Sequence, residues 1–203
     1  MVKAINTMIC IMLPITIVTC MCSREIVTIA YARGEFNANS VAMTSAALIG
    51  YALGFASSGV RDIILRGLYS FKNTKGPMIT GFFAVGANIM FSIILSHFIG
   101  ILGISIASSI SLTVNFLINS QMLKKHIPDY KFRVHLPVLL KQLPSAAFTI
   151  ATVLVVKHFV ASNLLTFMIS AVIGIGGYGL ILMAMKIEEV NIIKEKALSK
   201  IGR

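Results

Sequence analysis

The sequence of 203 residues is poor in charged side chains, has only five prolines and contains no tryptophan. Charged residues make up 12% of the chain, about half of the roughly 25% that is typical of a soluble domain. Hydrophobic residues make up 57%, so the chain has too few polar side chains to cover a water-facing surface. This composition excludes an ordinary soluble domain, and the lack of low-complexity tracts argues against fibrous and disordered classes.

Cysteine is also scarce, and its placement indicates packing. Cys10, Cys20 and Cys22 lie in or at the end of the first long apolar run, where cysteine behaves as a small apolar side chain. A G-x-G-x-x-G pattern over residues 174–179 lies inside another apolar run, where glycine serves helix packing. The chain shows no P-loop, no metal-ligand spacing, no paired carboxylates and no nucleophile beside a base. The sequence therefore predicts no cofactor, no metal and no enzyme activity.

Long uncharged runs dominate what is present, and a helix needs about 20 apolar residues to cross a bilayer core. The run from Met78 to Leu123 has 46 residues without Asp, Glu, Lys or Arg, and Gly100 and Gly103 near its middle predict a hairpin of two helices. The sequence predicts an all-α polytopic membrane protein with six transmembrane helices, at about 4–23, 40–66, 78–98, 101–123, 136–159 and 164–185. Residues 1–123 would hold four helices and residues 136–185 two more, separated by a basic loop over 124–135 and followed by a basic tail over 186–203.

The first apolar run could instead be a cleaved signal peptide, because Lys3 precedes it and Cys20 follows Ile17-Val18-Thr19 in the manner of a lipoprotein cleavage site. Thr is a poor residue before such a cysteine, and the run is longer than a usual signal core. More spans also follow it. We therefore expect this run to remain as the first membrane-spanning helix.

The basic residues give a net charge of +11 and lie mainly in the short breaks between apolar runs. A nucleic-acid site would gather Lys and Arg on one folded face, so no nucleic-acid partner is expected. If the amino terminus is cytoplasmic, only Arg24, Arg33 and Lys157 of the 18 Lys and Arg fall on the outer side. The positive-inside rule then predicts that both termini, the 124–135 loop and the 186–203 tail are cytoplasmic.

Charged residues within the spans are the candidates for a substrate-binding site. Arg61 and Asp62 interrupt the second helix, which we expect to continue to about Phe71, and Arg66 follows about one turn later. Long charged side chains near a membrane boundary commonly extend to the lipid headgroups. The functional alternative is that Arg61, Asp62 and Arg66 face a central water-filled cavity and bind a charged headgroup.

Small residues one helical turn apart predict two seams of close helix packing. They are Gly50, Gly54 and Ser58 in one helix, and Gly103, Ala107 and Ser111 in another.

Several short motifs occur in a characteristic order. They are Arg33-Gly34-Glu35-Phe36, Tyr51-Ala-Leu-Gly54, the loop Arg66-Gly-Leu-Tyr69-Ser-Phe-Lys-Asn73-Thr74-Lys-Gly-Pro77, Asn88, and Gly100-Ile-Leu-Gly103-Ile-Ser-Ile-Ala107-Ser. Together they resemble the MurJ/MviN family of lipid II flippases, within the MOP exporter superfamily. The last motif recurs across that superfamily, whereas the R-G-E-F and Y-x-x-x-N-T-x-x-P elements are more specific.

The resemblance covers nearly the whole chain but only the carboxy-terminal part of the family, whose members have fourteen helices in two lobes. It implies that the six helices are the ninth to the fourteenth, in the carboxy-terminal lobe of a MurJ-like flippase. The family's cationic residues that hold the substrate pyrophosphate lie mainly on its first, second and eighth helices, so none is carried over to this chain. The last two helices correspond to the pair that forms a groove for the lipid tail.

The function that the resemblance implies is translocation of lipid II, the lipid-linked peptidoglycan precursor, across the bacterial cytoplasmic membrane. The implied partners are lipid II, the bilayer and the missing amino-terminal lobe, supplied in cis or in trans. An ion gradient or the membrane potential would drive transport. The alternatives are a flippase for another lipid-linked oligosaccharide, a drug exporter of the same superfamily, and a truncated, non-transporting membrane module.

Overall fold

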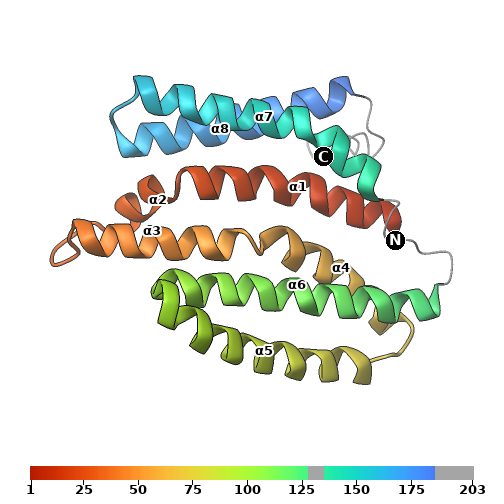
Figure 1. Cartoon of the computed structure of the whole chain (residues 1–203). Helices are drawn as coiled ribbons and strands as arrows, with labels where there is room; N and C mark the ends of the chain where they lie inside the picture. The colour runs from red at the N-terminus through yellow and green to blue at the C-terminus, as the bar shows by residue number, and fades with distance from the viewer. Residues whose placement is uncertain (128–134, 186–203) are drawn as a thin grey trace, which may run out of the picture.

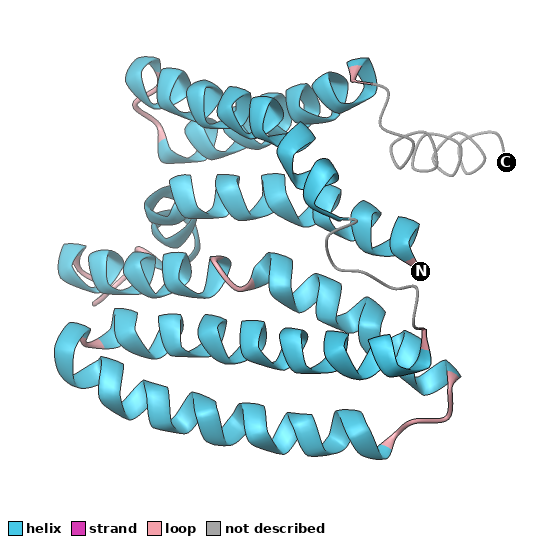
Figure 2. Ribbon diagram, turned by 45° about the vertical axis from the view of Figure 1, so that its right-hand side comes forward, coloured by secondary structure: helices cyan, strands magenta, loops and turns pink. Residues whose placement is uncertain are grey.

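The computed structural model describes residues 1–127 and 135–185, and every regular element within them is an α-helix (Figures 1 and 2). The helices are α1 (Val2–Met21), α2 (Ser23–Tyr31), α3 (Ala38–Ala52), α4 (Phe55–Ser70), α5 (Lys75–Ile99), α6 (Ile101–His126), α7 (Leu136–Phe159) and α8 (Asn163–Ala184). In these residues six segments are long and apolar enough to cross a membrane, with α3 and α4 counted as one. The predicted all-α polytopic membrane fold is confirmed.

The helices lie side by side in an open row (Figure 1). At one edge α5 packs on α6, and α6 packs on both α3 and α4. The broken segment of α3 and α4 then packs on α1 and α2, and α1 carries the α7–α8 pair at the other edge. Successive spans run in opposite directions, whereas α4 continues in the direction of α3 (Figure 2).

The first span differs from the single helix predicted over 4–23. The helix α1 ends at Met21, and α2 begins at Ser23 after a break at Cys22, whose φ and ψ are −100° and 20°. Pro14 lies inside α1, where it removes one backbone hydrogen bond and weakens the helix without ending it. The break redirects the chain, so that α2 packs on α3 and α8.

The second span, predicted over 40–66, is also broken. Leu53 and Gly54 separate α3 from α4, and α4 continues to Ser70. A Cβ atom on Gly54 would lie 2.7 Å from Ser109 Oγ, and Ser109 Oγ donates a hydrogen bond to the carbonyl oxygen of Gly50. The glycines therefore let α3 approach α6 closely, which is the role predicted for the small-residue seams.

A hairpin turning at Gly100 joins α5 to α6. Gly100 has a φ of 60° and a ψ of −137°, a backbone conformation that side chains with a Cβ atom rarely adopt. Polar side chains then hold the two helices together inside the bundle, where no water competes for their hydrogen bonds. Thr80 Oγ1 donates to Asn119 Oδ1 at 3.1 Å, and Asn115 Nδ2 donates to the carbonyl oxygen of Thr80 at 3.0 Å.

Buried polar contacts also hold α7 and α8 on α1. Gln142 of α7 is fully buried, and its Nε2 atom donates to Cys10 Sγ of α1 at 3.2 Å. Tyr178 OH of α8 donates to Gln142 Oε1 at 2.8 Å. In addition, Thr149 Oγ1 donates to the carbonyl oxygen of Gly174 at 3.2 Å, so the glycine-rich stretch of α8 serves helix packing.

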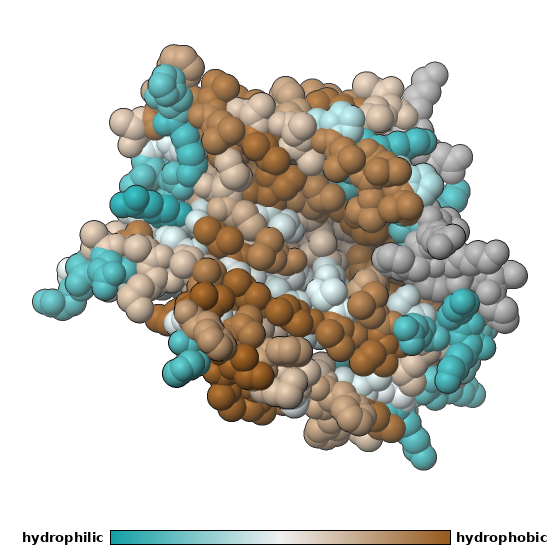
Figure 3. All heavy atoms as spheres, in the orientation of Figure 1, coloured by the Kyte–Doolittle hydropathy of each residue, from teal (hydrophilic) through white to brown (hydrophobic). Residues whose placement is uncertain are grey.

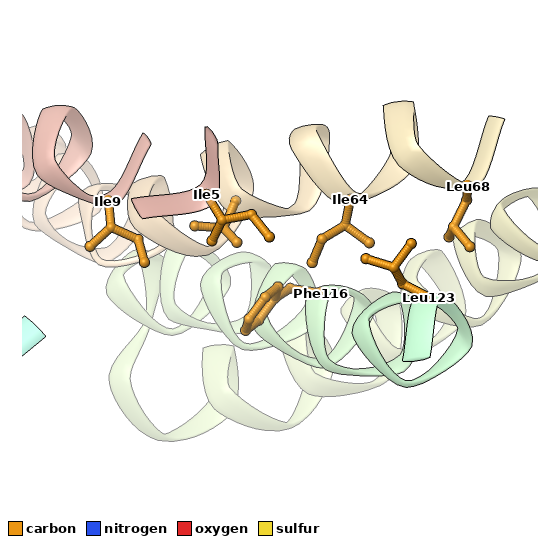
Figure 4. Packing of buried hydrophobic residues seen from close by; sticks show 7 residues of the cluster. Ile5, Ile9, Ile64, Leu68, Phe116 and Leu123 are labelled. Carbon is orange, nitrogen blue, oxygen red and sulfur yellow. The ribbon is translucent and has the colours of Figure 1, made fainter. Parts of the chain in front are cut away.

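An apolar cluster joins α1, α4 and α6 (Figure 4). Its members are Ile5, Ile9, Val60, Ile64, Leu68, Phe116 and Leu123. Because Val60, Ile64 and Leu68 are spaced by four residues, they form one stripe along α4 and fix which face of that helix turns inward.

An apolar belt crosses the middle of the visible face, with polar side chains at the two ends of the helices (Figure 3). One end, called here the lysine-rich end, carries the start of α1, the α4–α5 loop and the end of α6, with Lys3, Lys72, Lys75, Lys124 and Lys125. The opposite end carries Arg24, Arg33 and Lys157. The basic loop predicted over 124–135 begins later than expected, because α6 continues through Lys124 and Lys125 to His126. Residues 128–134 and the predicted tail over 186–203 lie outside the described residues.

Candidate functional site

The predicted site residues lie on α4, and two of them form an ion pair. Arg61 Nη2 donates to Asp62 Oδ1 at 2.8 Å, and Arg61 Nε donates to the same oxygen at 3.2 Å. Their side chains are 26% and 49% exposed, so both still reach the surface of the described part of the chain. The structure therefore brings Arg61 and Asp62 together. Arg66 is exposed and makes no ion pair with another described residue.

These charged groups occupy the face of α4 that turns away from the apolar cluster. Because Val60 and Ile64 point toward α1 and α6, helical periodicity places Asp62 and Arg66 on the other side, four residues apart. Tyr69 extends the same face and is 49% exposed. Arg61, next to this face, is paired with Asp62 and is the less exposed of the two, at 26% against 49%.

The Arg61–Asp62 pair lies well inside the span. Gly67 of α4 lies next to Met1, where the chain begins, and Leu123, which precedes Lys124 and Lys125 in α6. Gly67 therefore lies at the level of the lysine-rich end. Arg61 precedes Gly67 by six residues in the helix, which corresponds to about 9 Å along its axis. An ion pair at this depth costs free energy unless water or a polar partner reaches it. Both side chains are reachable from the surface of the described part of the chain.

The chemistry available on this face is recognition of charge. The guanidinium group of Arg61 has five N–H donors, of which Asp62 takes two, so donors are left for a second anionic group. Arg66 adds a second cation five residues after Arg61, on the side of the lysine-rich end. A guanidinium group of this kind can bind a phosphate or a carboxylate. Asp62 offsets the charge of Arg61, so Arg66 leaves this face with one net positive charge.

One charged pair was missed by sequence reasoning. Lys157 Nζ, in the last turn of α7, lies 2.8 Å from Glu25 Oε1 of α2, and the Glu25 side chain is only 12% exposed. The pair joins helices that are far apart in the chain, and helical periodicity gives no information about such a partner. The only available signal was that both residues fall near the same predicted membrane boundary.

Comparison with known proteins gives one family. The family model described as "Lipid II flippase MurJ" matches residues 1–176. The chain is 34% identical over 89 residues to the lipid II flippase MurJ of Thermosipho africanus, covering 44% of this chain and 19% of that protein. It is 30% identical over 93 residues to the probable lipid II flippase MurJ of Vibrio cholerae, covering 46% of this chain and 18% of the relative.

A longer match extends over most of the chain. The probable lipid II flippase MurJ of Thermotoga maritima is 24% identical over 169 residues, covering 83% of this chain and 34% of that protein. The chain thus spans about a third of the length of this relative, and the matches to the other two cover less.

Proposed function

The chain belongs to the lipid II flippase MurJ family, and from that membership we propose that it forms part of the carboxy-terminal lobe of a lipid II flippase. The family match over residues 1–176 carries this proposal. Such a protein moves a lipid-linked peptidoglycan precursor from one leaflet of the membrane to the other. Its work is binding and alternating access of a cavity between two lobes.

The charged face of α4 forms part of the cavity wall in this proposal. Its support is the position of the Arg61–Asp62 pair, about 9 Å inside the span and on the exposed side of α4. A charged pair in that place is stable when it borders water or the polar part of a substrate. Arg61 and Arg66 would contact the anionic headgroup, and Asp62 would hold Arg61 in position. The remaining wall would come from the amino-terminal lobe, in cis or in trans.

The lysine-rich end faces the cytoplasm in this proposal, which places both termini on the inner side of a bacterial cytoplasmic membrane. Lys72, Lys75, Lys124 and Lys125 at that end support this orientation, because cytoplasmic loops are enriched in basic residues. Translocation then runs from the inner to the outer leaflet, driven by an ion gradient or the membrane potential.

Depletion in living cells tests the substrate. The protein that carries this chain is placed under a repressible promoter, and lipid II exposed at the outer surface is measured as the protein disappears. We expect surface-exposed lipid II to fall while total lipid II rises. Unchanged surface exposure after full depletion would refute the lipid II assignment, and selective loss of another lipid-linked oligosaccharide or of drug resistance would identify the corresponding exporter instead.

A further inference from the structure

A cavity of about 510 Å³ lies at the opposite end of the bundle, between α2, the start of α3 and the start of α8. Its volume falls in the range of about 300–1,000 Å³ that is usual for small-ligand sites. The residues that define its chemistry are Arg24, Glu25, Thr28, Phe36, Asn37 and Asn163. This cavity is separate from the charged face of α4, so the inference drawn from it does not depend on the transport proposal.

The cavity lining holds one cation, Arg24, and one anion, Glu25, which is paired with Lys157 outside the lining. Glu25 Oε1 lies 2.8 Å from Lys157 Nζ, which offsets the charge of this carboxylate, whereas Glu25 Oε2 is buried with no hydrogen-bond partner among the described residues. Arg24 is exposed and forms no ion pair with another described residue. The guanidinium group of Arg24 is therefore the unpaired charge in the lining that a ligand would contact. Guanidinium groups commonly bind two phosphate oxygens at once.

Two asparagines add neutral hydrogen-bond donors. Asn37 Oδ1 accepts hydrogen bonds from Ser40 N at 3.0 Å and Ser40 Oγ at 3.2 Å, so its oxygen is used for capping α3 and its amide nitrogen remains to donate. Asn163 is exposed at the first residue of α8. Arg24 of α2, Asn37 before α3 and Asn163 of α8 line the same cavity, and they are the groups that an oxyanion there would contact.

The cavity lies at the level of the membrane surface. Glu25 pairs with the last turn of α7, and Asn163 begins α8, so the lining residues sit where two of the spans end. Phe36 provides an apolar wall beside the polar donors. A lipid headgroup presents the same combination, an anionic phosphate next to apolar glycerol and acyl carbons.

We propose that this cavity binds a phosphate group, held chiefly by Arg24 with Asn37 and Asn163 as additional donors. The phosphate belongs either to a lipid headgroup at the membrane surface or to a soluble phosphate. The two sources share the same contacts with the protein and differ in whether acyl chains contribute.

Lipid-adduct measurements on the purified chain test the proposal. Native mass spectrometry compares retention of dioleoylphosphatidic acid with that of dioleoylglycerol, which has the same acyl chains and no phosphate. Calorimetric titration with inorganic phosphate tests the soluble source. We expect Arg24→Gln to weaken phosphate-dependent binding about tenfold or more and Asn163→Ala to weaken it less, whereas Arg33→Gln, at the same end but outside the cavity, leaves it within about twofold.

The outcomes separate the possibilities. Arg24-dependent binding of phosphatidic acid alone assigns the site to a lipid headgroup, and Arg24-dependent binding of inorganic phosphate as well assigns it to the phosphate group itself. Equal retention of phosphatidic acid and dioleoylglycerol would overturn the proposal, as would equal losses in Arg24→Gln and Arg33→Gln. Circular dichroism verifies that each variant is helical, and Asn163→Ala replaces Arg24→Gln as the deciding variant if the latter does not fold.

Discussion

The Glu25–Lys157 pair ties α2 to α7 through two side chains of very different exposure. The side chain of Glu25 is 12% exposed and that of Lys157 is 31% exposed. Because a nearly buried carboxylate is costly without a counter-ion, removing the lysine should harm the fold more than removing both charges.

We predict that Lys157→Met lowers the free energy of unfolding by about 1–3 kcal/mol, because it leaves the buried Glu25 carboxylate without its partner. The double variant Glu25→Gln/Lys157→Met should recover part of that loss. Denaturant titration in detergent, followed by circular dichroism, measures both values. Lys141→Met is the matched control on α7, since Lys141 is exposed. A double variant no more stable than Lys157→Met would show that the pair is not coupled.

The Arg61–Asp62 pair makes a different prediction, because its proposed role is contact with substrate. In the protein that carries this chain, Arg61→Gln should lower lipid II translocation about tenfold or more, and the double variant Arg61→Gln/Asp62→Asn should stay as low. A purely structural pair would instead regain activity when both charges are removed. The measurement is the initial translocation rate at matched expression, with Lys72→Gln in the α4–α5 loop as control.

Arg61 and Asp62 could be predicted as candidates from the sequence, because charges within an apolar run are conspicuous. Their mutual contact and the exposure of Arg66 required the structure, since both depend on which face of α4 is turned toward α1 and α6. Glu25 could not be found from the sequence, because its partner comes from a distant helix.

At the level of the helices, the close packing of α3 and the α3–α4 break on α6 depends on the absence of a side chain at Gly50 and Gly54. Gly54 has a φ of −84° and a ψ of −10°, which any residue can adopt, so a substitution there acts through space rather than backbone strain. A Cβ atom at this position would lie 2.7 Å from Ser109 Oγ and 3.1 Å from Ser109 Cα.

We predict that Gly54→Ala destabilises the protein by about 1–3 kcal/mol, the usual cost of overpacking a close contact. Gly176→Ala on α8 is the matched control, because a Cβ atom there would have nothing within 4 Å. Thermal unfolding in the same detergent compares the two variants. Equal melting temperatures would contradict a close contact between Gly54, at the break between α3 and α4, and Ser109 of α6.

The number of spans follows from the lengths of the uncharged runs, and the sequence was sufficient to predict it. The breaks at Cys22 and at Leu53–Gly54 could not be predicted, because a helix in a membrane breaks where neighbouring helices satisfy the backbone groups that are released. The predicted seam of small residues indicated that Gly54 packs closely, but not that α3 ends beside it.

The described helices form an open row, and both outer edges, α5 and the α7–α8 pair, expose large apolar side chains. The helix α5 exposes large apolar side chains along its length, such as Phe82 at 73%, Phe83 at 70% and Phe98 at 78%. Lipid can cover this apolar edge, whereas the charged face of α4 requires water or polar groups. The chain spans about a third or less of the length of the relatives that it matches.

The most direct test of this account is translocation of labelled lipid II in proteoliposomes. The measurement compares three preparations at equal protein content: the purified chain alone, the chain together with an amino-terminal lobe of the family, and empty liposomes. We predict that the chain alone is no faster than empty liposomes and that the two-part assembly moves lipid II at least tenfold faster. A two-part assembly that forms a stable complex yet moves lipid II no faster than empty liposomes would contradict the proposal that this chain is a working part of a lipid II flippase.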